Sequence, residues 1–432
     1  MARRTGARLA VGLVAFCLCA ELLGLAAYYA DTGALFYVHR KSYPELLPVP
    51  QDRLVVGEAL HPYFGVTHRP GTPFDIPAAL REGTAVPARL TTNNFGFVST
   101  HRYPFAKTAD DQVILGIFGG SVGLWFCQIG APRLVQELQA TPYFRDREIV
   151  PLCFAHEGYK QPQQALLLAY FLSLGQTYDL VVNIDGFNEV ALGTLNSERG
   201  LDVSMPSVQH LDPLVALVNR SVLTPEKLES LAAIFRDRQT LVDLRQRIAA
   251  NPSAAVHLVL DWYDGHVSNR YTRELGRFSN LPANPPENAL IQATPAIPGR
   301  DPDVTSDLAE LWTGASLLMD QMVEARGGAY FHVLQPNQYF TTRPFAPAEA
   351  AVALNDASPY KPLVEEGYPV LAEAAQTLTD AGVAYFDATR IFDGVDAPVY
   401  MDDCCHYTLR GNQLLADFIA SAIRATPGPW SQ

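Results

Sequence analysis

Positive charge is scarce in this sequence of 432 residues, which has 32 Lys and Arg against 45 Asp and Glu. The net charge of −13 provides no surface that could neutralise phosphates, so nucleic acid is not expected among the partners. Only 18% of the residues are charged and 48% are hydrophobic. A chain of this length and composition can bury the core of one large α/β domain or of two ordinary ones.

Long apolar runs are scarce too, and one run alone is long enough to cross a membrane. It extends from Leu9 to Ala30 and exceeds the ~20 residues that a transmembrane helix needs. Three arginines precede it, at positions 3, 4 and 8. Positive charge on this side predicts that the N-terminus stays in the cytoplasm and that the rest of the chain lies outside the cytoplasmic membrane.

Residues 1–30 are therefore predicted to be a signal anchor with a single membrane pass. Glu21 inside the run is a cost for insertion, but one carboxyl does not prevent it. A cleaved signal peptide is the competing interpretation, because Ala26, Ala27 and Ala30 could form a cleavage site. The run is longer than the apolar part of a usual signal peptide, which favours the anchor.

Cysteines are few and give no metal-binding spacing. Cys17 and Cys19 lie in the apolar run, whereas Cys127, Cys153, Cys404 and Cys405 would face an oxidising compartment. Four cysteines allow three connectivities, of which a Cys127–Cys153 bridge belongs to one, and the sequence does not choose among them. No Cys/His spacing resembles a zinc site, so neither a metal nor an organic cofactor is expected.

The remaining chain divides into an N-terminal segment and a main domain. Residues 31–90 are rich in proline and turn signals and are predicted to be a linker with an irregular extension. Residues 91–425 alternate apolar strands with amphipathic helices, which predicts an α/β sandwich of three layers around a central parallel sheet. Residues 200–304 interrupt this alternation and are predicted to be an insertion, helical from Thr224 to about residue 250. Asn251-Pro252-Ser253 breaks this helix and could cap another, and residues 281–304 are proline-rich and irregular.

The alternation itself is regular. The expected strands cover residues 113–118, 149–154, 180–184, 330–334 and 383–386, and the expected helices lie near 122–140, 161–174, 306–322, 363–381 and 411–423. The first strand is apolar throughout, as expected for a strand that is buried on both faces.

Four short motifs carry the chemistry. The first three follow directly after predicted strands, and the last lies before the final helix: Gly119-Gly120-Ser121, Glu157-Gly158-Tyr159, Gly186-Phe187-Asn188-Glu189 and Asp403-Cys404-Cys405-His406. Because ligand sites in open parallel sheets lie beyond the carboxyl ends of the strands, these motifs are expected to meet at one edge of the sheet.

In this order the motifs resemble the four blocks of the SGNH (GDSL-like) hydrolases. The resemblance covers roughly residues 90–425 and implies a flavodoxin-like sheet. It implies that Ser121 is the nucleophile, that His406 is its base, and that Asp403 orients the base from position i−3. Asp402 is the neighbouring alternative to Asp403. An oxyanion hole would be formed by the N–H groups of Ser121 and Gly158 and by the side-chain amide of Asn188.

The chain departs from the family pattern at two positions. Gly120 stands where the family usually has aspartate, and Glu189 stands where the third block usually ends in aspartate. Each residue of the set also has an ordinary structural interpretation: Ser121 could cap a helix, Gly158 and Asn188 could be turn residues, and Asp403 with His406 could cap the last helix.

The resemblance implies a membrane-anchored serine esterase or O-acyltransferase of SGNH type. It would act outside the cytoplasmic membrane on acyl esters, acetyl above all, of envelope carbohydrate or related substrates, through an acyl-enzyme on Ser121. The expected partners are a small acyl ester or acylated glycan and the membrane; no protein partner is predicted. Two alternatives are an SGNH-like protein that binds a glycan or a partner without turnover, and a structural envelope protein that uses residues 200–304 as its partner surface.

Overall fold

A sheet of five parallel strands forms the centre of the larger of two units in the computed structural model, which describes residues 2–39, 58–211, 214, 224–282 and 303–431. The strand order is β6-β5-β7-β8-β9, which is the 2-1-3-4-5 order of a doubly wound sheet. The strands are β5 (Gln112–Gly119), β6 (Glu148–Ala155), β7 (Leu180–Asp185), β8 (Ala329–Leu334) and β9 (Ala384–Asp387). The predicted α/β fold class is confirmed.

Strand β5 lies in the interior of the sheet, where its residues from Val113 to Phe118 expose no polar side chain. It pairs with β6 on one side and β7 on the other, and all of its residues are buried. A strand that is buried on both faces needs an apolar side chain at every position, which explains the uninterrupted run from Val113 to Phe118.

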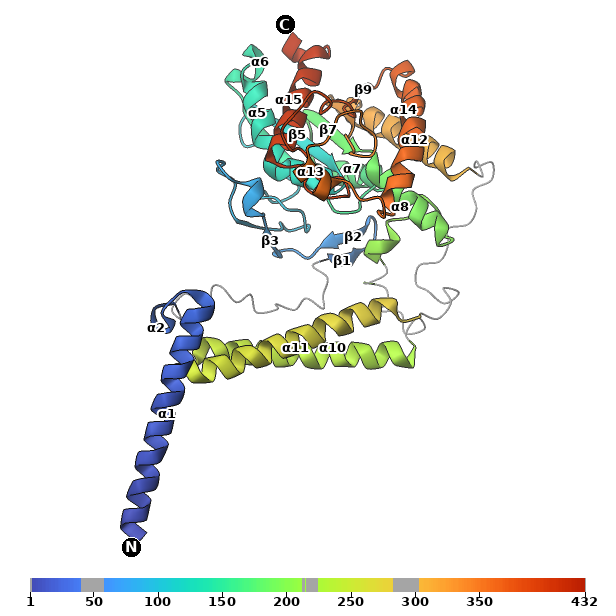
Figure 1. Cartoon of the computed structure of the whole chain (residues 1–432). Coiled ribbons are helices and arrows are strands. Elements are labelled where there is room, and N and C mark those ends of the chain that lie inside the picture. Colours follow the sequence, from blue (N-terminus) through green and yellow to red (C-terminus); the bar gives the residue numbers. More distant parts are fainter. Residues whose placement is uncertain (1, 40–57, 212–213, 215–223, 283–302, 432) are drawn as a thin grey trace. The chain divides into compact units, whose positions relative to one another are not determined.

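Helices cover both faces of the sheet (Figure 1). On one face lie α5 (Ala131–Gln139) and α15 (Leu409–Ala425), which pack against each other. The other face carries α7 (Gln163–Ser173), α8 (Phe187–Glu198), α12 (Val304–Glu324) and α14 (Tyr360–Asp380). Short helical segments complete this unit: η1 (Ala78–Leu80), α4 (Ser121–Trp125), a π-helical turn η2 (Phe126–Gly130), α6 (Pro142–Arg145), α13 (Pro347–Ala353) and η4 (Pro429–Ser431).

Residues 58–91 form four short strands, although residues 31–90 were predicted to be a linker and an irregular extension. The strands β1 (Glu58–His61) and β2 (Gly65–His68) pair with each other, as do β3 (Pro73–Asp75) and β4 (Arg89–Thr91). The Tyr159 hydroxyl donates to the Val66 carbonyl at 2.6 Å, which attaches β2 to the main domain. The prediction is wrong for this part of the segment, and residues 40–57 lie outside the described residues.

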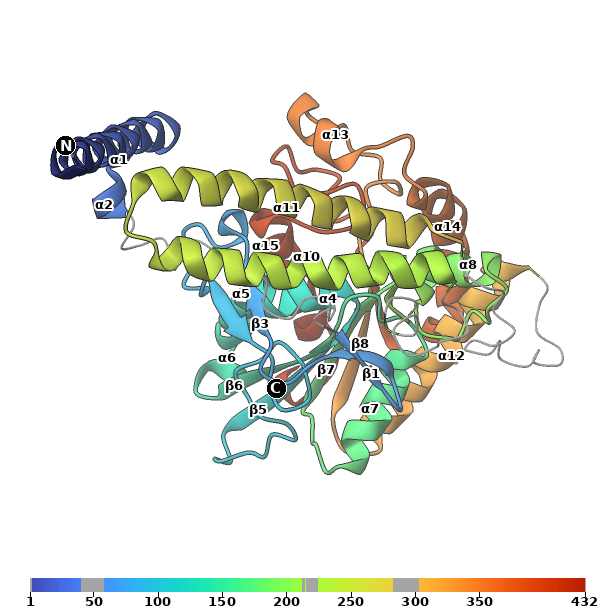
Figure 2. The same ribbon diagram turned by 90° about the horizontal axis from the view of Figure 1, so that it is seen from below.

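The second unit combines the N-terminal helix with the helical part of the predicted insertion. The chain divides into residues 1–56 with 216–290, and residues 57–215 with 291–432. Helices α10 (Pro225–Ala250) and α11 (Ala254–Asn280) lie side by side in both ribbon views (Figures 1 and 2). Thr224 caps α10 through its side chain, as the sequence indicates, whereas most of the proline-rich segment lies outside the described residues.

The N-terminal helix α1 (Ala2–Thr32) packs against the first turn of α11. The short helix α2 (Phe36–His39) follows α1. Residues Val14–Thr32 of α1 are long and apolar enough to cross a membrane. The Glu21 carboxylate accepts hydrogen bonds from Ser253 Oγ at 2.5 Å and from the Ala254 N–H at 2.7 Å. Gly24 permits the close approach, because a Cβ there would lie 2.4 Å from Ala255 N. The single acid of the apolar run therefore caps α11.

Candidate active site

Ser121 and His406 meet beyond the carboxyl end of β5. Ser121 begins α4 directly after the strand, and His406 precedes α15. The Ser121 Oγ and His406 Nε2 atoms are 2.8 Å apart, and both residues are half-buried, so the pair is accessible from solvent. This is hydrogen-bond distance between a hydroxyl and a base that can take its proton.

The carboxylate that faces His406 belongs to Asp402, so the assignment of this position to Asp403 is wrong. Asp402 Oδ2 lies 2.5 Å from His406 Nδ1. Asp402 Oδ1 accepts from the backbone N–H groups of Cys404 and Cys405, both at 3.0 Å, and from that of His406 at 3.2 Å. Asp403 instead accepts from Asn355 Nδ2 at 2.7 Å.

The turn explains why Asp402, four residues before His406, contacts the imidazole and Asp403, three residues before it, does not. An aspartate that accepts from the N–H groups of the following residues closes a tight turn, and its second oxygen is then directed toward the ring of His406. Burial works against ionisation of Asp402, but the hydrogen bond and charge of His406 and the backbone N–H groups outweigh it and lower the pKa of Asp402. The carboxylate can therefore hold the Nδ1–H tautomer of His406, which leaves Nε2 as the base toward Ser121.

The three residues predicted for the oxyanion hole lie just beyond the ends of the neighbouring strands β5, β6 and β7, in segments that contact one another. Asn188 Nδ2 donates to the Tyr159 carbonyl at 2.8 Å, and the same amide lies against Gly120, the neighbour of Ser121. Gly158 precedes Tyr159 and has a φ of +74°, a conformation that favours glycine. These contacts bring the Asn188 amide next to the segment that carries Ser121. That Ser121, Gly158 and Asn188 donate hydrogen bonds to an oxyanion stays a prediction.

The two departures from the family pattern have a physical explanation here. A Cβ at Gly120 would lie 2.0 Å from Asn188 Nδ2, so an aspartate would displace the amide. Glu189 is buried, and its two oxygens accept from the Gly186 N–H at 2.7 Å and the Gln161 N–H at 2.9 Å. Glu189 thus joins the loop of Asn188 to the loop that follows β6.

A buried polar network below the site was missed by the sequence analysis. Asp185 at the end of β7 accepts from Trp312 Nε1 and lies against His332 Nε2, both at 2.7 Å. Burial first, and then the charge of Asp185, raises the pKa of Glu189. Asp185, Trp312 and His332 come from three separate parts of the chain. Only Asp185 is adjacent to a recognised motif, the one that begins at Gly186 and ends at Glu189.

Two groups of side chains place metal-ligating atoms within 4.8 Å of one another in the described residues. One is Cys404, Cys405 and His406, and the other is His68, His156 and Glu157. In the first group both ring nitrogens of His406 already contact Ser121 and Asp402, so a cation there would compete with the pair. The second group lies beside Gly158 and was not recognised, because His68 is far from His156 and Glu157 in the sequence.

His156 is the most deeply buried member of the second group. Its ring stacks on Tyr159, and Nδ1 contacts the Glu157 carbonyl at 2.9 Å. Nε2 has no hydrogen-bond partner among the residues that the structure describes. Burial lowers the pKa of His156 to about 4, although the charge of Glu157 acts in the opposite direction. His156 is therefore neutral at pH 7.

We expect His156 to make the domain less stable as the pH falls. Its pKa is lower in the folded chain than the ordinary 6.5, so its contribution is complete above pH 6.5 and is lost as the pH falls toward 4. Between pH 7.5 and 5 this loss is about 2 kcal/mol of unfolding free energy. Denaturant unfolding of wild type and His156→Phe at both pH values measures it, because phenylalanine keeps the stacked ring and does not titrate.

Comparing wild type with His156→Phe also cancels the contribution of Glu58, whose effect on stability changes with pH in the opposite direction. Burial, followed by the charge of Glu157, raises the pKa of Glu58 to about 7, so Glu58 contributes stability below pH 4.5 that is lost as the pH rises toward 7. That trend is common to both proteins and cancels in their difference. An equal pH dependence in wild type and variant would contradict the assignment to His156.

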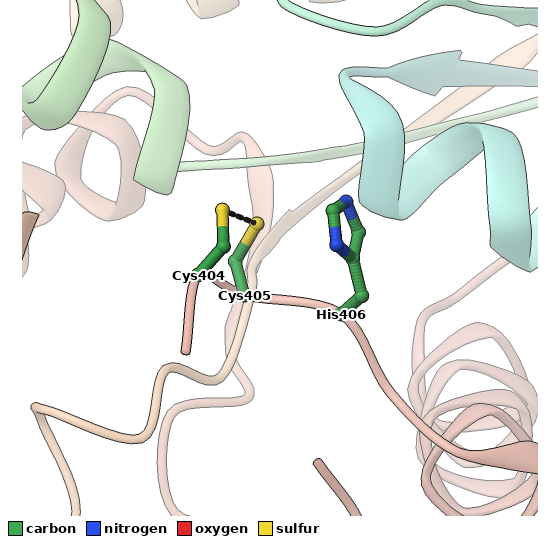
Figure 3. Close-up of side chains that lie close together, drawn as sticks. All are labelled: Cys404, Cys405 and His406. Atoms are coloured by element: carbon green, nitrogen blue, oxygen red, sulfur yellow. Dashed lines mark hydrogen bonds between the residues drawn. The ribbon is translucent and has the colours of Figure 1, made fainter. Parts of the chain in front are cut away.

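The cysteines outside the apolar helix fall into two pairs. Cys127 and Cys153 form a disulfide that joins the π-helical turn to β6, which is one of the bridges that the sequence allowed. Cys404 and Cys405 are free, and their sulfurs lie next to each other near His406 (Figure 3). The Cys405 sulfur also contacts the Ser121 hydroxyl.

A cavity of about 660 Å³ lies elsewhere on the same unit, and neither Ser121 nor His406 lines it. It is formed between α5, α15 and the segments on either side of β4, with Arg133, Arg410 and Asp417 among its polar residues. The position of the candidate site therefore rests on the contacts of Ser121, His406 and Asp402 and not on cavity size.

Comparison with known proteins gives a distant structural likeness. No family model matches the sequence, and no curated protein matches it. Among solved structures, the chain is similar to the crystal structure of the lipase Lip_vut3 from a goat rumen metagenome, at 10% identity and a TM-score of 0.34. The match covers 72% of this chain and 97% of the lipase.

Proposed function

We propose that this protein is a serine ester hydrolase or O-acyltransferase whose nucleophile is Ser121. The observation that carries the proposal is the chain of contacts from Ser121 Oγ to His406 Nε2, at 2.8 Å, and from His406 Nδ1 to Asp402, at 2.5 Å. A hydroxyl, a base and a carboxylate in this order are what acyl transfer needs, because the base removes the proton from the nucleophile and the carboxylate stabilises the imidazolium.

In the proposed reaction, Ser121 Oγ attacks the acyl carbon and His406 takes its proton. His406 then returns the proton to the alcohol that leaves, and an acyl-enzyme on Ser121 remains. Water or a sugar hydroxyl, deprotonated by His406, attacks the acyl carbon. The bond to Ser121 Oγ then breaks, and His406 returns the proton to this oxygen. The Asn188 amide and the N–H groups of Ser121 and Gly158 would donate to the oxyanion in both steps.

A fluorophosphonate probe tests the proposal on the full chain in detergent. We expect one adduct, mapped by mass spectrometry to Ser121, and hydrolysis of a small chromogenic acetyl ester that the probe abolishes. Labelling of any other serine with loss of turnover would contradict the assignment. Absence of both labelling and turnover would favour a binding protein, against which the Ser121–His406 contact already argues.

We further propose that α1 is retained as an uncleaved anchor, with the site on the outer side of the cytoplasmic membrane. The three arginines before the apolar run support this orientation. Retention is supported by the contacts of Glu21 and Gly24 with the first turn of α11. A signal peptide that is cleaved off would not keep such contacts with the mature chain. Such an anchor suits an acylated carbohydrate of the cell envelope as substrate.

Gly24→Leu tests the packing of α1 on α11. A side chain at position 24 overlaps the backbone of Ala255, so the helices must separate and Glu21 loses its N–H donors. We expect the amide hydrogens of Ala254 and Ala255 to exchange about tenfold faster in detergent micelles, since hydrogen bonds to a charged group contribute about 1.5–3 kcal/mol.

Gly12→Leu is the matched control for this experiment. Gly12 lies on the same helix with no atom within 4 Å of its would-be Cβ, and the substitution adds the same apolar bulk. Equal exchange rates at Ala254 and Ala255 in both variants would contradict the packing of α1 on α11.

A further inference from the structure

Two adjacent thiols lie at the candidate site without a role in the proposed reaction. The Sγ atoms of Cys404 and Cys405 are 3.0 Å apart and lie side by side (Figure 3). Cys405 is buried against Ser121, whereas Cys404 is half-buried and accessible. We propose that Cys404 and Cys405 form a reversible vicinal disulfide that lowers the activity of the Ser121 site.

The chemistry is a thiol–disulfide exchange with a disulfide oxidant, either a small molecule or a protein. The Cys404 thiolate attacks one sulfur of the oxidant, forms a mixed disulfide and releases one thiol. The Cys405 sulfur then attacks the Cys404 sulfur, loses its proton and releases the second thiol. Two protein thiols are oxidised by two electrons, and one disulfide of the oxidant is reduced to two thiols.

The order of these steps follows from the surroundings of the two sulfurs. Burial, and then the neighbouring Cys404, raises the pKa of the Cys405 thiol, so Cys405 is a poor first nucleophile. Cys404 is the accessible one and meets the oxidant first. The Cys127–Cys153 disulfide of the same chain is consistent with a compartment that supplies such an oxidant.

A bridge between adjacent residues is expected to be easy to reduce. The Cα atoms of neighbouring residues are about 3.8 Å apart, which is shorter than the roughly 4.4–6.8 Å that unstrained disulfides prefer. Strain makes a disulfide more oxidising, and strained bridges are the regulatory ones. Cys127 and Cys153, with Cα atoms 5.7 Å apart, lie within the preferred range.

The peptide that must adjust on ring closure also holds the catalytic turn. The Cys405 N–H donates to Asp402 Oδ1 at 3.0 Å, and the Cys404 carbonyl accepts from Asn337 Nδ2 at 3.1 Å. Rotation of this peptide breaks or lengthens both hydrogen bonds and moves the carboxylate away from His406. Oxidation also removes the thiol of Cys405 from its contact with Ser121. A misplacement of about 1 Å can reduce a rate ~10²-fold.

The test combines peptide mapping with turnover on the full chain in detergent, equilibrated in buffers of oxidised and reduced glutathione. After alkylation of free thiols under oxidising conditions, we expect the peptide with Cys404 and Cys405 to carry no alkyl group and to have lost two hydrogen atoms. Turnover of the acetyl ester should fall by about ten- to a hundredfold and return in a more reducing buffer that leaves Cys127–Cys153 intact.

Cys404→Ser is the matched variant, because it removes one sulfur and keeps a side chain of similar size. Its turnover should change by less than about twofold between the two buffers. Two alkyl groups on the wild-type peptide after oxidation would overturn the disulfide. A disulfide without a fall in turnover would overturn the regulation, and so would a fall that EDTA reverses and a reductant does not, since that identifies a bound cation.

The effect on turnover depends on the proposed function, but formation of the disulfide does not. If Ser121→Ala kept full turnover, the nucleophile assignment would fail while the peptide map still reported on Cys404 and Cys405. The two failures can therefore be told apart.

Discussion

Ser121→Ala is expected to reduce kcat/KM for a small acetyl ester by ~10⁴-fold or more. The substitution removes the one atom that can form the acyl-enzyme and leaves His406 without a proton to accept. Any residual rate would come from the oxyanion donors and substrate binding, which together still accelerate hydrolysis over water.

The structure allows this loss to be separated from unfolding. Ser121 is half-buried, and its hydroxyl contacts the side chains of His406 and Cys405, so alanine should leave the thermal midpoint nearly unchanged. Ser173→Ala is the matched control, because its hydroxyl is exposed and bonds only to the Tyr170 carbonyl on the same helix. Equal turnover of the two variants would rule out Ser121 as the nucleophile.

The central fold was predictable from the sequence because its strands carry an unambiguous signal. Residues 113–118 are apolar without interruption, and the observed strand covers Gln112–Gly119. Such a run is expected only where both faces of a strand are buried. By contrast, β1 to β4 have three or four residues each, and contacts such as that of Thr67 Oγ1 with the Phe95 carbonyl hold them in place. Strands this short contain too few residues to show a pattern of alternating apolar and polar side chains.

The role of Glu21 could not be predicted from the sequence for a similar reason. Within the run from Leu9 to Ala30, the sequence shows Glu21 only as a charged residue that makes membrane insertion less favourable. Its partners, the first N–H groups of α11, lie more than two hundred residues further along the chain. The same holds for Asp185, whose contacts with Trp312 and His332 connect three elements of the fold.

At the site itself, the sequence indicated Ser121, His406, Gly158 and Asn188, because each follows a recognisable strand or precedes the last helix. The contact of Ser121 with His406 is observed, and the donor roles of Gly158 and Asn188 stay predictions. It assigned the wrong aspartate, because spacing alone does not show where a carboxylate bonds. Asp402 accepts from the N–H groups of Cys404, Cys405 and His406, and these bonds turn its second oxygen toward His406. Asp403, adjacent in sequence, is directed toward Asn355 instead.

Asp402→Asn is therefore expected to reduce kcat by ~10⁴-fold, whereas Asp403→Asn should change it by less than about threefold. Asparagine at position 402 can still accept from the three N–H groups through its Oδ1, so the turn is kept. Its amide nitrogen, however, presents donors to His406 Nδ1 and favours the tautomer with the proton on Nε2. That tautomer cannot take the proton of Ser121.

The pair of variants is matched in size, charge change and position, so their comparison isolates the contact with His406. Steady-state kinetics with the acetyl ester at pH 7 to 9 provide the measurement, and thermal unfolding shows whether the turn is intact. Because the hydrogen bond and charge of His406 lower the pKa of Asp402 in spite of its burial, the carboxylate is ionised throughout this range and wild type keeps its advantage at every pH. A large loss in Asp403→Asn with little change in Asp402→Asn would contradict this geometry and would restore the i−3 spacing of the family pattern.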